Sequence, residues 1–247
     1  MTLIFSLECE LLARAQHLFD LGLFQRARVV LTRLLTLDET SNAIRVEGWR
    51  LFGLLEVAAG RFQRARSHFA AALGYAPDRA DLYHQFALAV EADPEAEPRR
   101  AYKAARKAAE LAPTVAEYWV TFGQLALRIR RRRVARRAFR QAVKLVPTQE
   151  NVLRELVEGL SHLGRYRLAK KALVSARLQK PSAFGLLQLW DQFRYEQARR
   201  QQQASAQPQK TVLPFVQTGE KTRRDLGANF TAHLFQFRNQ RGQQKSR

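Results

Sequence analysis

The stretch "WVTFGQLALRIRRRRVARRAFRQAVKLVP", residues 119–147, contains the clearest structural pattern of the sequence. In its second half, apolar residues recur at i, i+3, i+4, i+7, i+8 and i+11, namely Ala135, Ala138, Phe139, Ala142, Val143 and Val146. This spacing predicts one apolar stripe along an α-helix. The arginines between these residues therefore belong to the outer face of a core-forming helix, and not to a free basic arm.

The same pattern recurs along the chain, because Pro77, Pro113, Pro147 and Pro181 follow one another at intervals of 36, 34 and 34 residues. Trp-x-x-Phe-Gly occurs at 49–53 and at 119–123, and Ala-x-x-x-Phe follows at 65–69 and at 135–139. Three glycines stand where the first helix of a copy must end and can take the left-handed cap conformation: Gly22, Gly60 and Gly164. Arg130 takes this place in the fourth copy, which predicts a turn of different construction.

These motifs and their spacing resemble the tetratricopeptide repeat (TPR), a helix-turn-helix unit of 34 residues. The resemblance covers about residues 8–183, although Glu56 and Ala126 stand where the family usually has tyrosine. It implies an all-α fold, a right-handed α-α superhelix of about five repeats. We expect these repeats at 8–41, 46–79, 80–115, 116–149 and 150–183.

Two further segments follow the repeats. Residues 184–200 carry an apolar stripe of Leu186, Leu189, Trp190 and Phe193, which predicts a helix that caps the last repeat. Residues 201–247 begin as a polar spacer without periodicity and continue as a basic tail with short apolar islands at 212–215 and 230–237. We expect this tail to be disordered.

The charge balance is the outlier of the composition, with 42 Lys and Arg against 22 Asp and Glu and a net charge of +20. Such an excess indicates an anionic partner, although an arginine-rich composition alone also produces it. The single cysteine, Cys9, excludes an intrachain disulfide and is expected to be a small buried side chain. With no secretory signal pattern and no apolar run of about 20 residues, we expect a cytoplasmic protein.

The sequence contains no pattern of catalytic residues. Its five histidines match no metal-ligand spacing, and phosphate-binding, dinucleotide-binding and serine-hydrolase motifs are absent. The acidic segment "EADPEAE", residues 91–97, is interpreted as a solvated turn that starts a helix, and not as a metal site. We therefore expect no enzyme activity, no cofactor and no metal.

The resemblance to the TPR family implies that a peptide or helix binds along the concave face, which is formed by the first helix of each repeat. Placing the repeats in register assigns these residues to that face: Glu47, Arg50, Leu54, Asp81, His84, Leu88, Glu117, Val120, Gln124, Asn151, Arg154 and Glu158. Glu47, Asp81 and Glu117 are either ligand contacts or acids that match the helix dipole in the first turn. The positions of the lysine and asparagine clamp used by chaperone-binding members hold other residues, which disfavours chaperone tails.

The second helices are expected to carry a basic ribbon on the convex face, formed by Arg99, Lys103, Arg106, Arg133, Arg136, Arg137, Arg140, Arg167, Lys170 and Lys171. It could neutralise phosphates or an acidic protein surface, or it could be an ordinary solvated face. Tyr102 is the only aromatic residue expected there, so stacking of nucleic-acid bases is not indicated.

Three functions are compatible with these features. The first is a non-enzymatic scaffold that binds a protein or peptide in the concave groove. The alternative is a nucleic-acid-binding or ribosome-associated adaptor that docks through the basic ribbon and tail. In a third, the tail binds the groove of its own chain, with Phe230 and Leu234 as anchors. The partner and the oligomeric state stay open.

Overall fold

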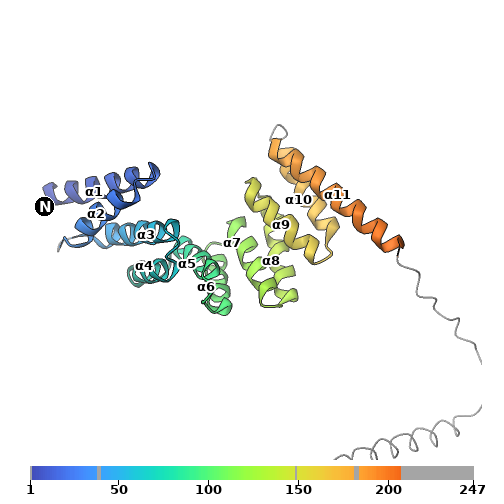
Figure 1. Cartoon of the computed structure of the whole chain (residues 1–247), viewed down its shortest axis with the longest axis horizontal. Helices are drawn as coiled ribbons and strands as arrows, with labels where there is room; N and C mark the ends of the chain where they lie inside the picture. The colour runs from blue at the N-terminus through green and yellow to red at the C-terminus, as the bar shows by residue number, and fades with distance from the viewer. Residues whose placement is uncertain (1, 38–39, 148, 181–183, 207–247) are drawn as a thin grey trace, which may run out of the picture. The chain divides into compact units, whose positions relative to one another are not determined.

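The computed structural model describes residues 2–37, 40–147, 149–180 and 184–206. These residues form eleven helices and no strand, which confirms the predicted all-α solenoid (Figure 1). None of these helices combines the length and hydrophobicity that a membrane span requires.

Ten helices form five pairs joined by short turns, and each pair packs on the next (Figure 1). The pairs are α1 (Thr2–Asp20) with α2 (Phe24–Leu35), α3 (Asn42–Ala58) with α4 (Phe62–Tyr75), α5 (Ala80–Ala92) with α6 (Pro98–Leu111), α7 (Ala116–Arg128) with α8 (Arg132–Leu145), and α9 (Glu150–His162) with α10 (Tyr166–Gln179). In the contacts between pairs, α2 packs on α3, α4 on α5, α6 on α7 and α8 on α9.

The last helix, α11 (Phe184–Ala206), buries Leu186, Leu189 and Phe193 against the core of the preceding repeats. It is longer than expected, because residues 201–206 of the predicted polar spacer are helical. Glutamine and alanine form helices readily, so the run needs no apolar stripe to continue. By its contacts the chain divides into two units, Met1–Arg200 and Gln201–Arg247. The apolar islands of the tail lie outside the described residues.

The core is built from small residues around large rings. Ala135, Ala138, Phe139, Ala142 and Val143 are buried as their spacing predicts. A Cβ atom built on Gly123 would lie 2.4 Å from Cε1 of Phe139, so glycine is what lets α7 approach this ring. The prediction for Val146 was wrong: α8 ends at Leu145, and Val146 caps it with a left-handed φ of 49°.

The turns inside the repeats show a second correction. Gly22, Gly60 and Gly164 have φ of 72°, 70° and 69°, which confirms the predicted left-handed caps. Arg130 has φ 61°, so the fourth turn has the same construction despite the side chain. Because an L-residue pays about 1–2 kcal/mol for the left-handed region, this turn carries strain that the glycine turns do not.

Backbone hydrogen bonds confirm that the turns are equivalent. The amide of Arg130 donates to the carbonyl of Leu127 at 2.9 Å, and that of Arg131 donates to Ala126 at 2.7 Å. This is the paired bonding of a Schellman cap, in which two late carbonyls of the helix are satisfied. The sequence-based expectation failed because the hydrogen bonds of the turn outweigh the steric preference of one residue.

The departure at Glu56 from the usual tyrosine has a structural role. Its side chain is 1% exposed, and its two oxygens bind Nη2 of Arg28 at 2.6 Å and Nε of Arg61 at 2.5 Å. Both arginines are partly exposed, so this buried carboxylate links the first repeat to the turn of the second. The fourth repeat has Ala126 at the corresponding position, fully buried and without charge.

The acidic segment 91–97 was expected to be solvated, and this is wrong for Asp93. Asp93 is buried and binds Nη2 of Arg66 at 2.7 Å, while its Oδ1 accepts a hydrogen bond from the amide of Glu95. The longer turn between α5 and α6 is therefore anchored to α4 by an ion pair between neighbouring repeats.

Candidate functional site: a groove along α5, α7 and α9

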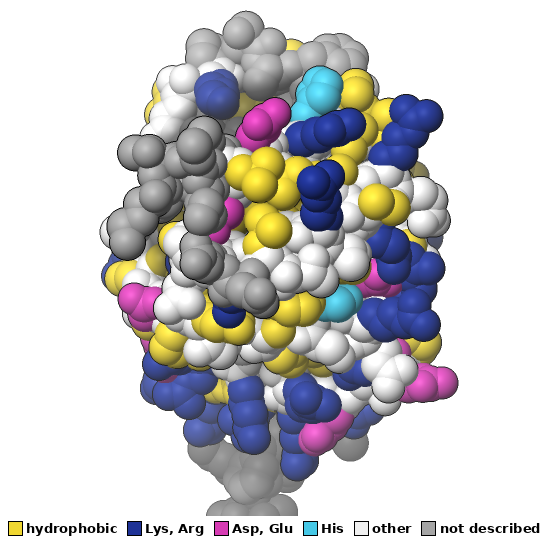
Figure 2. Space-filling model, turned by 90° about the vertical axis from the view of Figure 1, so that its left-hand side faces the viewer, with side chains coloured by type: hydrophobic (Ala, Val, Ile, Leu, Met, Phe, Trp, Pro, Cys, Tyr) yellow, Lys and Arg dark blue, Asp and Glu magenta, His cyan; other side chains and the backbone are white. Residues whose placement is uncertain are grey.

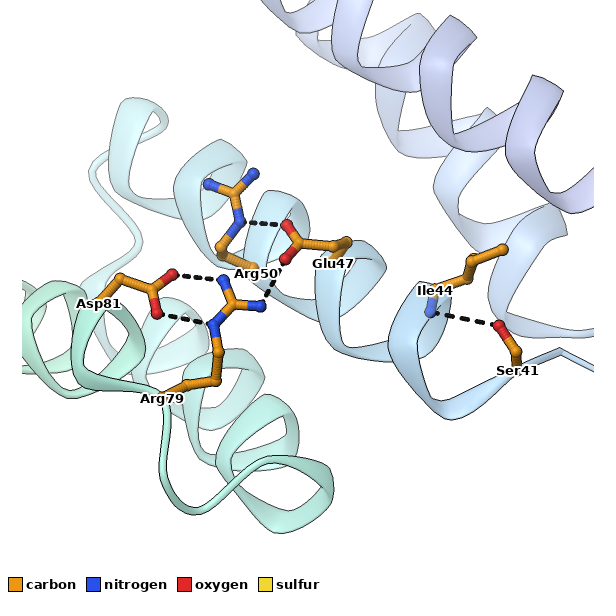
Figure 3. A network of polar contacts seen from close by, with 6 residues as sticks. All are labelled: Ser41, Ile44, Glu47, Arg50, Arg79 and Asp81. Atoms are coloured by element: carbon orange, nitrogen blue, oxygen red, sulfur yellow. Dashed lines mark hydrogen bonds and ion pairs between the residues drawn. The ribbon is translucent and has the colours of Figure 1, made fainter. Parts of the chain in front are cut away.

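Two groups of the predicted groove residues lie together in the structure, and the first is an ion network near the start of α3 and α5 (Figure 3). Arg79 lies between the two helices and donates from Nη1 to Glu47 at 2.7 Å and from Nε and Nη2 to Asp81 at 2.7 and 2.5 Å. Arg50 donates from Nε to the other oxygen of Glu47 at 2.6 Å.

This network neutralises Glu47 and Asp81, two of the three acids for which the sequence left open a ligand contact or a match to the helix dipole. The hydrogen bond from Arg79 lowers the pKa of Asp81. Partial burial alone would raise the pKa of Glu47, but the hydrogen bonds from Arg79 and Arg50 outweigh it and lower that pKa. Helical periodicity could not identify Arg79, because it precedes α5 as its N-cap residue.

His84 is not open to a ligand. Its side chain is buried between α5 and α7, with Nε2 2.9 Å from Oγ1 of Thr121 and the ring centroid 4.7 Å from that of Tyr118. Burial lowers the pKa of His84 to about 4, although Asp81 acts in the opposite direction. The imidazole is therefore a neutral part of the contact between the third and fourth repeats.

Other predicted groove residues are spread over the core and the surface. Leu54 packs against core residues, and Val120 is fully buried. Glu117 is half-buried, Asn151 is exposed, and the exposed Arg154 binds Glu150 one turn earlier on α9 at 2.6 Å.

The second group lies together in a groove of about 900 Å³ between the first helices of the third, fourth and fifth repeats. Three predicted residues, Leu88, Gln124 and Glu158, line it. The structure adds others that the sequence analysis did not assign: Glu91, Thr121, Leu127, Arg128, Arg130, Arg132, Glu155 and His162. Most of these lie in the last turns of the first helices or in the turn after α7, beyond the positions assigned by register.

One wall of the groove is acidic. Partial desolvation by its neighbours raises the pKa of Glu155, and the carboxylates of Glu91, Glu117 and Glu158 raise it further. Gln124 holds this wall in place, because its Nε2 donates to the backbone carbonyl of Glu155 at 2.7 Å and so ties α7 to α9. A cation placed here would relieve the repulsion between these carboxylates.

The last turn of α7 and the start of α8 supply the basic residues of the groove. Arg128 reaches from α7 to α5, where Nη1 lies 3.2 Å from the carbonyl oxygen and 3.4 Å from Oε1 of Glu91. Arg132 reaches α9, with Nη2 3.4 Å from the carbonyl of His162. The strained residue Arg130 lies between these two in the sequence. Leu88 and Leu127 complete an apolar part of the lining, so the groove offers both charges beside an apolar surface.

Comparisons with known proteins identify the fold. No protein-family model and no curated protein match the sequence. Among solved structures, PilF of Pseudomonas aeruginosa is 16% identical with a TM-score of 0.60, over 81% of this chain and 88% of that one. TTC0263, a TPR protein of Thermus thermophilus, is 18% identical with a TM-score of 0.55, over 76% and 97%. YrrB, titled a TPR protein with an unusual peptide-binding site, is 18% identical with a TM-score of 0.52, over 73% and 90%.

The chain has the TPR fold. Identities of this size establish the architecture alone, and the groove residues have to be argued from this structure. Among the described side chains, no group of three His, Cys, Asp or Glu residues is placed to hold a metal ion. Cys9, which was expected to be buried, is exposed beside Glu47 and Arg50 in a small separate hollow.

On the second helices of the TPR array, the basic ribbon has the exposure that its register predicts. Nine of its ten residues are exposed, and Arg136 is half-buried. Figure 2, which views the array from the end at α1, shows Lys and Arg side chains over the lower part and along the right-hand side of that view. Tyr102 differs from the expectation, because it is only 7% exposed.

Proposed function

We propose that this protein is a non-enzymatic scaffold that binds an extended peptide or a helix of a partner protein in the groove along α5, α7 and α9. The observation that carries the proposal is a groove of about 900 Å³ that is lined by acidic, basic and apolar side chains. Ligand sites combine these features, since apolar contacts supply affinity and a few polar groups supply orientation. YrrB, a TPR protein described as having an unusual peptide-binding site, has the same fold.

The charges of the groove favour a ligand with a basic side chain. Glu155 and Glu158 have no ion-pair partner within the described residues, whereas Arg128 has Glu91. A lysine or arginine beside Glu155 would remove the unfavourable interaction that raises the pKa of this carboxyl group. An acidic group of the ligand would lie toward Arg130 and Arg132.

The test is selection from a displayed library of random peptides, followed by titration of the enriched sequences. We expect peptides with a basic residue. A combined Leu88→Ser, Gln124→Ala and Glu158→Gln variant should bind them about tenfold more weakly or worse, which corresponds to about 1.4 kcal/mol.

The control carries the same three kinds of change at exposed positions of α11: Leu187→Ser, Gln188→Ala and Glu196→Gln. It should bind as the unchanged protein does. Equal binding by the groove variant, or equal loss in both variants, would contradict the assignment of the groove.

A further inference from the structure

Another hollow lies beside the turn between α7 and α8. Arg130 lines the groove, and the next residue, Arg131, lines a hollow of about 360 Å³ against α6. The residues around it, which we name the α6 pocket, are Arg99, Tyr102, Lys103, Arg106, Lys107, Glu110, Ile129 and Arg131. None of them belongs to the groove.

The α6 pocket has five cationic side chains and one carboxylate. Within the described residues, Glu110 pairs only with Arg106, at 2.7 Å. Arg99, Lys103 and Lys107 follow one another at intervals of four, so they lie on the same face of α6, about 6 Å apart along the helix axis. The pocket therefore concentrates positive charge that the protein itself does not neutralise.

Arg131 is held in place without being neutralised. Its guanidinium carbon lies 5.2 Å from the centroid of the Tyr102 ring, and Nη1 lies 3.4 Å from the Tyr102 hydroxyl. The corresponding residue of the second repeat, Arg61, binds the buried Glu56. Since Ala126 replaces that carboxylate in the fourth repeat, Arg131 keeps its full charge at the edge of the pocket.

The surroundings of the pocket fit a nucleic acid better than a protein. On α6 and α8, all of whose residues the structure describes, no large hydrophobic side chain is exposed. Protein interfaces have an apolar centre, whereas nucleic-acid interfaces are polar and strongly basic. The positive surface continues over α8 through exposed residues such as Arg133, Arg137 and Arg140.

We propose that the α6 pocket and the adjoining basic ribbon bind the phosphodiester backbone of a double-stranded nucleic acid, with one phosphate group in the pocket. The duplex is favoured over a single strand because Tyr102, covered by Arg131, offers no ring on which a base could stack. Binding of this kind depends on phosphate contacts and not on base sequence.

The test is fluorescence anisotropy of the full chain with labelled RNA and DNA duplexes of about 20 base pairs, between about 50 and 200 mM salt. We expect binding at low salt that weakens steeply as salt rises. A combined Lys103→Gln, Lys107→Gln and Arg131→Gln variant should reduce the slope of log K against log salt by about 2 to 3, because about three phosphate contacts are lost.

A matched variant, Arg26→Gln, Arg33→Gln and Arg64→Gln, removes the same charge at exposed positions of α2 and α4. It should change the slope by less than about one unit. Equal loss in both variants, no duplex binding at low salt, or preferential binding of a polyglutamate peptide would each overturn the proposal. The groove variant described above should bind the duplex normally, so failure of one proposal is distinguishable from failure of the other.

Discussion

The second repeat has Glu56 where the fourth has Ala126, and Gly60 where the fourth has Arg130. Both repeats share the Trp-x-x-Phe-Gly motif and the same hydrogen bonds in the turn. In the second repeat the buried carboxylate binds two arginines and the glycine turns without strain. In the fourth, an arginine takes the strained position and the following arginine stacks on Tyr102.

This difference shows how one framework serves two purposes. The second repeat uses its arginines for stability, because Arg28 and Arg61 are held by a carboxylate of the same chain. The fourth repeat directs Arg130 to the groove and Arg131 to the α6 pocket. Within the described residues neither of these two arginines forms an ion pair, and Arg130 carries the strain of its left-handed backbone. Four variants test this comparison.

The largest effect is expected from Glu56→Ala in the second repeat. Loss of the carboxylate leaves two arginines without their partner and a cavity at a position that is 1% exposed. We expect the free energy of unfolding to fall by about 3 kcal/mol, measured by urea denaturation. Glu97→Ala, at an exposed carboxylate that makes no cap bond, is the control and should change it by about 0.5 kcal/mol at most. Equal effects would show that the network does not stabilise the second repeat.

An effect of up to similar size concerns pH and the contact between the third and fourth repeats. Thr121 of the fourth repeat contacts His84, whereas the matching residue of the second repeat is the buried Leu51. The pKa of His84 is about 4 in the folded state, compared with the ordinary value of 6.5 in the unfolded chain. The unfolded chain therefore binds the proton first as pH falls. Stability should therefore be lost between about pH 6.5 and 4, by up to about 3 kcal/mol.

His84→Gln keeps a hydrogen-bonding group but does not titrate. The difference in unfolding free energy between the protein and this variant should change across that pH range. A difference independent of pH would mean that the pKa of His84 is the same in the folded and unfolded states.

Next in size is the effect of Gly123→Ala. The added Cβ would lie 2.4 Å from Phe139, and this ring is also within 2.4 Å of a Cβ built on Gly159, so it has little room to move. We expect a loss of about 2–3 kcal/mol. Gly53→Ala in the second repeat meets Phe69 at 2.5 Å, but Phe69 packs near Ala89 and not near a second glycine. The loss of unfolding free energy in Gly53→Ala should therefore be smaller than in Gly123→Ala.

Rescue distinguishes steric overlap from other causes. Phe139→Leu should recover part of the stability of Gly123→Ala, measured by thermal denaturation. If the double variant is less stable by the sum of the two single losses, the contact between Gly123 and Phe139 is not the cause.

The smallest effect is expected from Arg130→Gly. Glycine removes the strain of φ 61°, so we expect stability to increase by about 0.5–1 kcal/mol, measured as a higher urea midpoint. Because Arg130 lines the groove, the same variant should bind the selected peptides more weakly. A destabilised variant would show that Arg130 makes contacts worth more than its backbone strain.

Local patterns predicted what depends on one helix or one turn. The stripe from Ala135 to Val143 is buried and the glycine caps are left-handed, because helical periodicity and backbone sterics act within a few residues. The same reasoning failed at Arg130, where the chain accepts strain to keep the hydrogen bonds of the turn. It also failed at Val146. It failed at Asp93 because the partner of this carboxylate, Arg66, belongs to the preceding repeat.

The candidate site was predicted only in part, because its geometry depends on contacts between repeats. Register on the first helices identified Leu88, Gln124 and Glu158 as groove residues, and the structure brings them together. The same register also included His84, although His84 is covered by a helix 37 residues further along. Periodicity shows which face of a helix turns inward, but not which residues of the next repeat cover it.

Residue spacing within each unit was enough to predict the repeat, the all-α architecture and the exposed basic side chains of the second helices. Which charges are neutralised inside the protein depends on contacts between repeats. Stacking the repeats sets the separations on which hydrogen bonds and Coulomb interactions depend. It joins Glu47 to Arg79 and Glu56 to Arg28, and it leaves the cations of the α6 pocket in excess.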